Sequence, residues 1–256
     1  MTEQGGLRGK RILICNDDGI GAVGLKVLEQ AALALCDDVW VVAPATEQSG
    51  KAHSFTIGSP MTAEKLSDRR YAVSGTPTDC VLYAFNVLLK DKKPDLVLAG
   101  INHGENVGLD LLYSGTVGIA TEAALQGAKG FAFSLAGAKK GSAFWDVTGR
   151  RVVRVLPVLA GTDGANVFNV NFPATNDPAP MVSATVCDRK IGDDIDVLSV
   201  DGNKTVFSVR STRSAYAKTP DCDAEALMRG CVTVTALTAG VPQSVDVLKN
   251  VDLTLE

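Results

Sequence analysis

The sequence predicts an α/β fold in which helices cover both faces of a doubly wound, mainly parallel sheet, with an antiparallel β-hairpin extension at the C-terminal end. Up to Pro173, short apolar runs alternate with helical patterns, and this repeat is typical of a parallel sheet. The runs are continuously apolar rather than alternating, which indicates strands covered on both faces. After Pro173 the segments become short and β-branched, with Gly, Pro, Asp and Asn between them, which favours hairpins.

This change in residue pattern at Pro173 divides the chain into two parts. We expect residues 1–173 to form the catalytic core, and residues 174–256 to form a β-rich extension that packs on the core and carries an oligomerisation hairpin. A chain of 256 residues is long enough to bury the core that this arrangement requires.

The first part of the chain predicts strands and helices in alternation. The expected strands are RILIC at 11–15, VWVVAP at 39–44, DLVLAG at 95–100, FAFSLAG at 131–137 and NVFNVNFP at 166–173. The expected helices span 22–35, 78–89, 117–126 and 145–159. Thr76, Pro77 and Asp79 mark the start of the second helix, because they match an N-cap, a first-turn proline and a capping-box partner.

Two other regions have their own character. The polar segment 45–60, ATEQSGKAHSFTIGSP, is long and rich in small residues, which favours a functional loop or flap. In the second part, the candidate hairpin strands are MVSATVCD at 181–188, KTVFSVRS at 204–211, CVTVTAL at 231–237 and SVDVL at 244–248. We expect this antiparallel region to reach out from the main sheet, toward a partner subunit.

Charge and composition exclude several classes of protein. A net charge of −4 and a pI near 5.3 provide no basic field for a nucleic-acid polymer. The N-terminus lacks the apolar stretch of a signal peptide and no run is long enough for a membrane helix, so we expect a cytoplasmic protein. Six cysteines without any C-x-x-C pair are expected to be reduced core thiols.

The loops after the first three strands carry unusual polar residues. Ligands of an open parallel sheet bind beyond the carboxyl ends of its strands. Asp17 and Asp18 follow the first strand, and two adjacent carboxylates repel unless a cation lies between them. A hard divalent ion such as Mg²⁺ or Mn²⁺ fits this pair, and Ser49 and Asn102 can add neutral oxygen ligands from the next two loops.

The segment Ser114-Gly115-Thr116 directly precedes a predicted helix. Hydroxyls, unpaired backbone N–H groups and the helix dipole together make this a candidate phosphate site, although simple N-capping would need the same residues. Asn16 and Gly50, which lie in the other two site loops, are included as candidate substrate contacts. The chain contains no G-x-x-x-x-G-K-[ST] loop, which argues against a P-loop NTPase.

His53 and His103, the only two histidines, both lie in candidate site loops. Each is a general acid, a substrate contact or an ordinary loop residue, and the sequence leaves these possibilities open.

Several blocks taken together resemble one known family. From about Arg11 to Pro173 the sequence resembles the survival protein E (SurE) family of 5′/3′-nucleotidases, and the blocks that carry the resemblance are ILICNDDGIGAVGL, VVAPATEQSG, HSFTI, VSGTPTDCV, PDLVLAGINHGENVG, LYSGTVGIATEAALQG and NVNFP. The resemblance implies a Rossmann-like core and a β-hairpin and C-terminal segment exchanged between subunits, in homodimers or homotetramers.

The same resemblance implies an activity. It is that of a metal-dependent phosphomonoesterase of the acid-phosphatase type, with one divalent ion per subunit, that hydrolyses nucleoside monophosphates to nucleoside and phosphate. The implied metal ligands are Asp17, Asp18, Ser49 and Asn102, and the implied phosphate contacts are Asn106, Ser114, Gly115 and Thr116. Asp17 and Asp18 are the expected catalytic residues.

The chain departs from the family pattern in two places. His103 follows the metal-site asparagine where the family commonly has arginine. Near the C-terminal end, the family's Thr-Asp, Gly-Tyr-Val-Ser and Thr-Pro-Leu appear as Cys222-Asp223, Gly230-Cys231-Val232-Thr233 and Thr235-Ala236-Leu237. The resemblance therefore supports the metal ligands more strongly than it supports the oligomer contacts or the base preference.

Three other classes of protein share some of these sequence features. A receiver-like phospho-acceptor module also has paired acids after its first strand, but it needs an aspartate after the third, where this chain has Gly100-Ile101-Asn102. A D-x-D-x-T phosphatase does not match Asp17-Asp18-Gly19. A nucleotide-binding regulatory module without turnover would keep every binding feature. Within the nucleotidase hypothesis, Asp17 either activates a water or attacks phosphorus itself.

Overall fold

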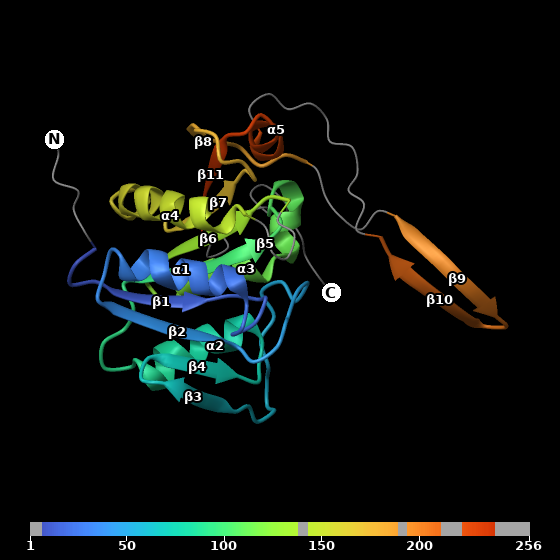
Figure 1. Cartoon of the computed structure of the whole chain (residues 1–256). Helices are drawn as coiled ribbons and strands as arrows, with labels where there is room; N and C mark the ends of the chain where they lie inside the picture. The colour runs from blue at the N-terminus through green and yellow to red at the C-terminus, as the bar shows by residue number, and fades with distance from the viewer. Residues whose placement is uncertain (1–6, 138–142, 189–193, 211–221, 239–256) are drawn as a thin grey trace, which may run out of the picture.

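The computed structural model describes residues 7–137, 143–188, 194–210 and 222–238, and its centre is a nine-stranded sheet (Figure 1). The strand order across this sheet is β3-β4-β2-β1-β5-β6-β7-β11-β8. Its strands are β1 (Arg11–Cys15), β2 (Asp38–Pro44), β3 (Ala63–Ser67), β4 (Arg70–Val73), β5 (Leu96–His103), β6 (Lys129–Leu135), β7 (Val167–Phe172), β8 (Met181–Ser183) and β11 (Val232–Leu237).

The middle of the sheet is parallel. Six neighbouring strands from β4 to β7 run in one direction, and β1 lies between β2 and β5. The chain moves outward in opposite directions from β1 and β5, so the gap between these two strands is the topological switch point of a doubly wound sheet. The predicted fold class is confirmed, including the antiparallel C-terminal hairpin.

Helices cover both faces of the sheet (Figure 1). The helices are α1 (Val23–Leu33), α2 (Pro77–Tyr83), the π-helix η1 (Ala84–Leu88), the 3-10 helix η2 (Gly108–Tyr113), α3 (Gly115–Leu125), α4 (Trp145–Ala160) and α5 (Asp223–Met228). α1 and α4 pack on one face with a core of aliphatic and Phe side chains, whereas α2, η1 and α3 pack on the other. None of the helices in the described ranges is long and apolar enough to cross a membrane.

The second helix begins as predicted but ends differently. The Thr76 hydroxyl accepts a hydrogen bond from the Asp79 N–H at 3.2 Å, and the Asp79 carboxylate accepts one from the Thr76 N–H at 2.8 Å. This is the expected capping box. The helix then widens into η1, where the Leu89 N–H donates to the carbonyl of Ala84, five residues earlier. Apolar spacing does not distinguish a π turn from an α turn, so the sequence predicted one continuous helix.

The segments after Pro173 only partly match the expected hairpins. β9 (Ile195–Asp201) and β10 (Lys204–Val209) do form an antiparallel hairpin, which Figure 1 shows away from the main sheet. β8 and β11, however, extend the main sheet: β11 pairs antiparallel with β7, and β8 pairs parallel with β11. The candidate strand SVDVL at 244–248 lies outside the described residues.

Five elements were not predicted, and two of them are η2 and β9. α5 follows Cys222, and β3 with β4 forms an edge hairpin whose outer strand is exposed throughout. β3, β4 and α5 are short and contain several polar residues, so neither apolar periodicity nor a continuous apolar run reveals them.

The expectation that all six cysteines are reduced is wrong for two of them. Cys187 and Cys222 form a disulfide, whereas Cys15, Cys36, Cys80 and Cys231 are free. The two partners are 35 residues apart in the sequence. A bridge between Thr185 and Cys222 in the backbone brings them together, and no local spacing signals such a pair.

Candidate active site

A polar pocket of about 350 Å³ lies at the carboxyl ends of β1, β2 and β5, beside the switch point. Its described lining contains carboxylates, amides and one histidine but neither lysine nor arginine. The lining residues are Asp17, Asp18, Glu47, Ser49, Gly50, Asn102, His103, Gly104, Glu105, Asn106, Asp110, Tyr113 and Ser114.

Asp17 and Asp18 both line this pocket. Asp17 is 5% exposed, and burial raises its pKa from the ordinary 3.8 to about 6. The hydrogen bond from Thr116 opposes that rise, whereas the neighbouring charge of Asp18 adds to it. Burial also raises the pKa of Asp18, against the opposing influence of His103. Both carboxylates are therefore poorly stabilised as anions by the protein alone.

The start of α3 packs directly on Asp17. The buried Thr116 hydroxyl donates to Oδ1 of Asp17 at 2.7 Å. A Cβ atom added at Gly115 would lie 2.9 Å from both Cβ and Oδ2 of Asp17, so only glycine fits there. The Ser114 hydroxyl accepts a hydrogen bond from the Val117 N–H at 3.1 Å and caps the helix.

The structure thus separates the three residues of the predicted phosphate segment. Ser114 lines the pocket, whereas Gly115 and Thr116 lie against Asp17 and are not among the lining residues. Asn16 is fully buried, and its Nδ2 donates to the Gly19 carbonyl at 2.9 Å, so it shapes the loop after β1.

The loop after β2 contributes Ser49 and Gly50 to the pocket lining. The Ser49 hydroxyl is exposed and donates to Oε1 of Glu47 at 3.0 Å. The backbone of this loop is fixed at Gln48, whose N–H donates to the Asp17 carbonyl at 2.7 Å. Glu47 adds a third carboxylate to the pocket, and its charge contributes to the raised pKa of both aspartates.

His53 lies farther along the same loop and does not line the pocket. Its Nε2 lies 3.0 Å from Oε2 of the nearly buried Glu122 on α3. Burial raises the pKa of Glu122, but hydrogen bonds from His53 and Gln126 hold it below its usual range. Thr56 adds a second anchor, because its N–H and hydroxyl both donate to Asp79. His53 therefore links the polar loop after β2 to α3.

His103 does reach the pocket. Its Nδ1 lies 3.3 Å from Oδ2 of Asp18, and its ring meets the Trp145 ring edge-on with centroids 4.9 Å apart. Nε2 is buried and has no hydrogen-bond partner in the described part of the chain. Beside it, Nδ2 of Asn102 donates to the Gly104 carbonyl at 2.9 Å, so Oδ1 of that amide is the atom that could bind a cation.

The donor set fits a hard divalent cation. Asp17 and Asp18 have raised pKa values, and within the described residues the buried Oδ2 of Asp18 has only its 3.3 Å ion-pair contact with Nδ1 of His103. Carboxylate, hydroxyl and amide oxygens are the ligands that such ions prefer. A phosphate could enter a pocket lined by these carboxylates only if a cation neutralised them first.

Sequence reasoning missed several lining residues. Tyr113, Asp110 and Glu105 line the pocket but were not proposed as site residues. Tyr113 and Asp110 belong to η2, and Glu105 lies in the loop before it. Their position between Asn102 and Ser114 in the sequence was the available signal.

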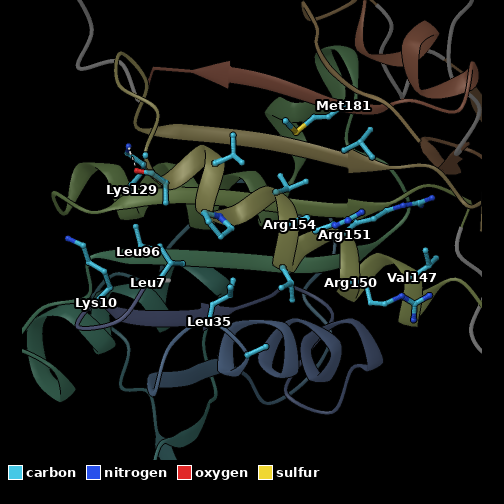
Figure 2. A pocket seen from close by; sticks show the side chains of 18 of the residues that line it. Leu7, Lys10, Leu35, Leu96, Lys129, Val147, Arg150, Arg151, Arg154 and Met181 are labelled. Atoms are coloured by element: carbon cyan, nitrogen blue, oxygen red, sulfur yellow. Dashed lines mark hydrogen bonds between the residues drawn. The ribbon is translucent and has the colours of Figure 1, made fainter. Parts of the chain in front are cut away.

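A larger hollow of about 2230 Å³ lies elsewhere, and Figure 2 shows it between α4 and the amino ends of the central strands. It is rich in basic side chains such as Arg150, Arg151 and Arg154. Asp95, one of its acids, is already bound by Lys10 at 3.1 Å and by the Arg11 N–H at 2.7 Å. Among the described residues that line this hollow, the acids are Asp95 and Asp177, which are not adjacent in the sequence as Asp17 and Asp18 are, so the smaller pocket is the candidate active site.

Comparisons with known proteins give matches over most of the chain. The family model described as "Survival protein SurE" matches residues 12–192. The chain is 44% identical over 237 residues to the 5′-nucleotidase SurE of Paramagnetospirillum magneticum and 41% identical over 238 residues to that of Rhodospirillum rubrum, covering 89% of both chains in each pair. The crystal structure of the SurE protein from Aquifex aeolicus superposes with a TM-score of 0.79 at 30% identity, covering 91% of this chain and 95% of that one.

Proposed function

The chain belongs to the survival protein SurE family, and from this premise we propose that it is a divalent-metal-dependent nucleotidase that hydrolyses nucleoside monophosphates to nucleoside and phosphate. The observation that carries the proposal is the pair Asp17 and Asp18 at the switch point, with pKa values raised by burial. Such a pair is stabilised by a cation, and the cation in turn attracts a phosphomonoester.

The metal would be held by Asp17, Asp18, Ser49 and Asn102, which all line the pocket. A bound Mg²⁺ or Mn²⁺ supplies a Lewis acid for a phosphate oxygen and lowers the pKa of a coordinated water. Asp17 would orient or deprotonate the attacking water. Direct attack by Asp17 on phosphorus is the alternative, and trapping an aspartyl-phosphate would establish it.

The phosphate would contact residues around the start of α3. This helix has 11 residues, and its N-terminal N–H groups and dipole favour an anion. Ser114, Gly115, Thr116 and Asn106 are the proposed phosphate contacts from this side, and Gly50 is the proposed contact from the loop after β2. Asn16 was expected to contact the substrate, but it is fully buried and does not line the pocket, so its proposed role is to hold the loop that carries Asp17 and Asp18. The Thr116 hydroxyl already donates to Asp17, so the backbone N–H groups at the start of α3 are the proposed donors for phosphate oxygens.

Tyr113 supports a nucleoside as the leaving group. It lines the pocket, is 49% exposed, and is the only aromatic residue apart from His103 in the described lining. An exposed aromatic face beside a phosphate site can stack on a base of any identity.

We also propose a homodimer or homotetramer in the cytoplasm, with residues 1–173 as catalytic core and residues 174–256 as the extension that is exchanged. The β9–β10 hairpin supports an interface, because it exposes apolar side chains that water would otherwise contact. These side chains are Ile195, Val197, Leu198, Val200, Val206, Phe207 and Val209.

A phosphate-release screen tests the activity. We expect hydrolysis of AMP or GMP with Mn²⁺ or Mg²⁺, loss of activity with EDTA, and recovery when the metal is restored. Sugar phosphates and short polyphosphate serve as competing substrate classes. Full activity in chelator would overturn metal dependence, and tight nucleotide binding without phosphate release would favour a regulatory module instead.

A further inference from the structure

Two asparagines of β7 hold the backbone of Asn106 from behind the pocket. The Asn106 N–H donates to Oδ1 of Asn171 at 2.8 Å, and the Asn106 carbonyl accepts from Nδ2 of the same side chain at 3.0 Å. Nδ2 of Asn169 donates to that carbonyl at 2.8 Å. Both backbone polar groups of one pocket residue are therefore bound by side chains from a strand more than 60 residues away in the sequence.

Asn169 and Asn171 are fully buried and stand two residues apart, so they share one face of β7. The other face carries Phe168, Val170 and Phe172, which pack in the apolar core. A buried amide costs free energy for each polar atom that is not hydrogen-bonded, and Oδ1 of Asn169 has no partner within the described residues, whereas apolar residues would fill the same space without that cost. Their presence points to a task at Asn106.

Asn106 needs such support because its loop lacks regular structure. It lies between the end of β5 and the start of η2, two residues after Gly104, which has a φ of +104°. Its side chain is also fixed, since Nδ2 donates to the buried Ser134 hydroxyl at 3.0 Å. An amide nitrogen has two hydrogens, so the second remains for an oxygen of a bound phosphate.

We propose that Asn169 and Asn171 are positioning residues, which fix Asn106 relative to Asp17 and Asp18 so that its amide binds the phosphate of the substrate. This inference rests on the proposed function and deepens it. β7 lies inside the sheet, between β6 and β11, and a strand in that position is a rigid support for a loop residue.

Valine substitutions separate positioning from general packing. Asn171→Val and Asn169→Val remove the contacts with Asn106 while keeping a side chain suited to a buried strand. Thr233→Val is the matched control: Thr233 lies opposite Asn171 on β11, is fully buried, and its hydroxyl has no partner among the described residues.

The full-length variants are compared in KM and kcat for AMP, in the inhibition constant of inorganic phosphate, and in the dissociation constant of Mn²⁺. For Asn171→Val we expect KM and the phosphate inhibition constant to rise at least about tenfold, with Mn²⁺ affinity within about twofold of wild type. Thr233→Val should leave all four values within about twofold. Unchanged phosphate inhibition in Asn171→Val would overturn the inference, as would an equal loss of Mn²⁺ affinity, because a merely structural defect affects the whole site.

Folding of each variant is checked by its melting temperature. If Asn171→Val does not fold, Asn169→Val provides the test, because it keeps both hydrogen bonds between Asn171 and Asn106. A folded Asn169→Val protein with the phosphate inhibition constant of wild type would overturn the inference. Failure of the proposed function is distinguishable, because it would appear in the wild-type protein as no Mn²⁺-dependent release of phosphate from AMP, and the positioning role would fall with it.

Discussion

The hydroxyl of Thr116, the second residue of α3, donates to Oδ1 of Asp17 at the end of β1, at 2.7 Å. This contact joins the start of α3, where we propose that phosphate binds, to the carboxylate pair, and it favours the ionised form of Asp17. A hydrogen bond to a charged group contributes about 1.5–3 kcal/mol. Any ligand that needs ionised Asp17 therefore gains from it.

Thr116→Val should accordingly weaken Mn²⁺ binding about tenfold to a hundredfold. Valine has nearly the same shape, so the fold is retained. Isothermal titration with Mn²⁺ measures the loss, and Thr116→Ser, which keeps the hydroxyl, should stay close to wild type. Equal Mn²⁺ affinities in the valine and serine variants would show that this hydrogen bond does not support the metal site.

The raised pKa of Asp17 predicts how the metal-free protein responds to pH. Its pKa is about 6 in the folded protein against an ordinary 3.8, so the folded state binds more protons than the unfolded chain between these values. Stability must therefore fall as the pH rises through this window. From pH 4.5 to pH 7 the contribution of Asp17 amounts to a loss of about 2 kcal/mol.

Asp17→Asn removes this titration and, with it, metal-dependent hydrolysis of AMP. Urea unfolding in EDTA at the two pH values should show that wild type loses about 2 kcal/mol more than the variant. Added Mn²⁺ should stabilise wild type more at pH 7 than at pH 4.5, because protons compete for the same carboxylate. Parallel pH profiles for the two proteins would contradict the raised pKa, and unchanged turnover in the variant would remove the site assignment.

The close packing of Gly115 against Asp17 predicts that a larger residue at position 115 reduces activity. In Gly115→Ala the new Cβ would lie 2.9 Å from Asp17, so either the carboxylate or the start of α3 must move. A displacement of about 1 Å at a catalytic group can reduce the rate about a hundredfold. We expect that loss in kcat/KM for AMP with a nearly unchanged melting temperature.

Gly161→Ala is the control for this substitution. Gly161 lies at the C-terminal end of α4, where an added Cβ has only ordinary contacts at 3.6 Å and beyond. It should retain wild-type kcat/KM. Full activity in Gly115→Ala would mean that the helix start can move away from Asp17 at no cost.

Features encoded by neighbouring residues were predictable from the sequence. The apolar run before Asn16, the polar loop that follows it and the capping box of Thr76 and Asp79 each depend on a few consecutive residues. Because strand ends in a parallel sheet meet at one edge, the loops of Asp17, Ser49 and Asn102 could be expected in one pocket, and the structure brings them together.

Features that depend on distant pairs were not predictable. Thr116 and Asp17 are 99 residues apart, and Asn171 and Asn106 are 65 apart. A single sequence contains no signal for such hydrogen bonds, because they depend on the packing of α3 and β7 rather than on local spacing. The parallel pairing of β8 with β11 escaped prediction for the same reason.

The disulfide makes a prediction that a thiol count checks. Without reductant, the denatured protein should react with four equivalents of maleimide, because only Cys15, Cys36, Cys80 and Cys231 are free. After treatment with a dithiol reductant it should react with six. Cross-linking residues 35 apart typically contributes about 2–4 kcal/mol, so reduction should lower the melting temperature. Six reactive thiols before reduction would refute the Cys187–Cys222 bond.

The β9–β10 hairpin makes a prediction about assembly. Phe207 and Val197 face each other across its two strands and are 59% and 61% exposed, so each hairpin presents an apolar pair to its surroundings. If another subunit covers this pair, Phe207→Glu places a charge in the interface and should lower the molar mass measured by light scattering, while the core melts as in wild type. Asn203→Glu adds the same charge at the hairpin turn without removing apolar surface, and it should leave the mass unchanged. A Phe207→Glu protein of wild-type mass at micromolar concentration would show that this face of the hairpin does not hold the subunits together.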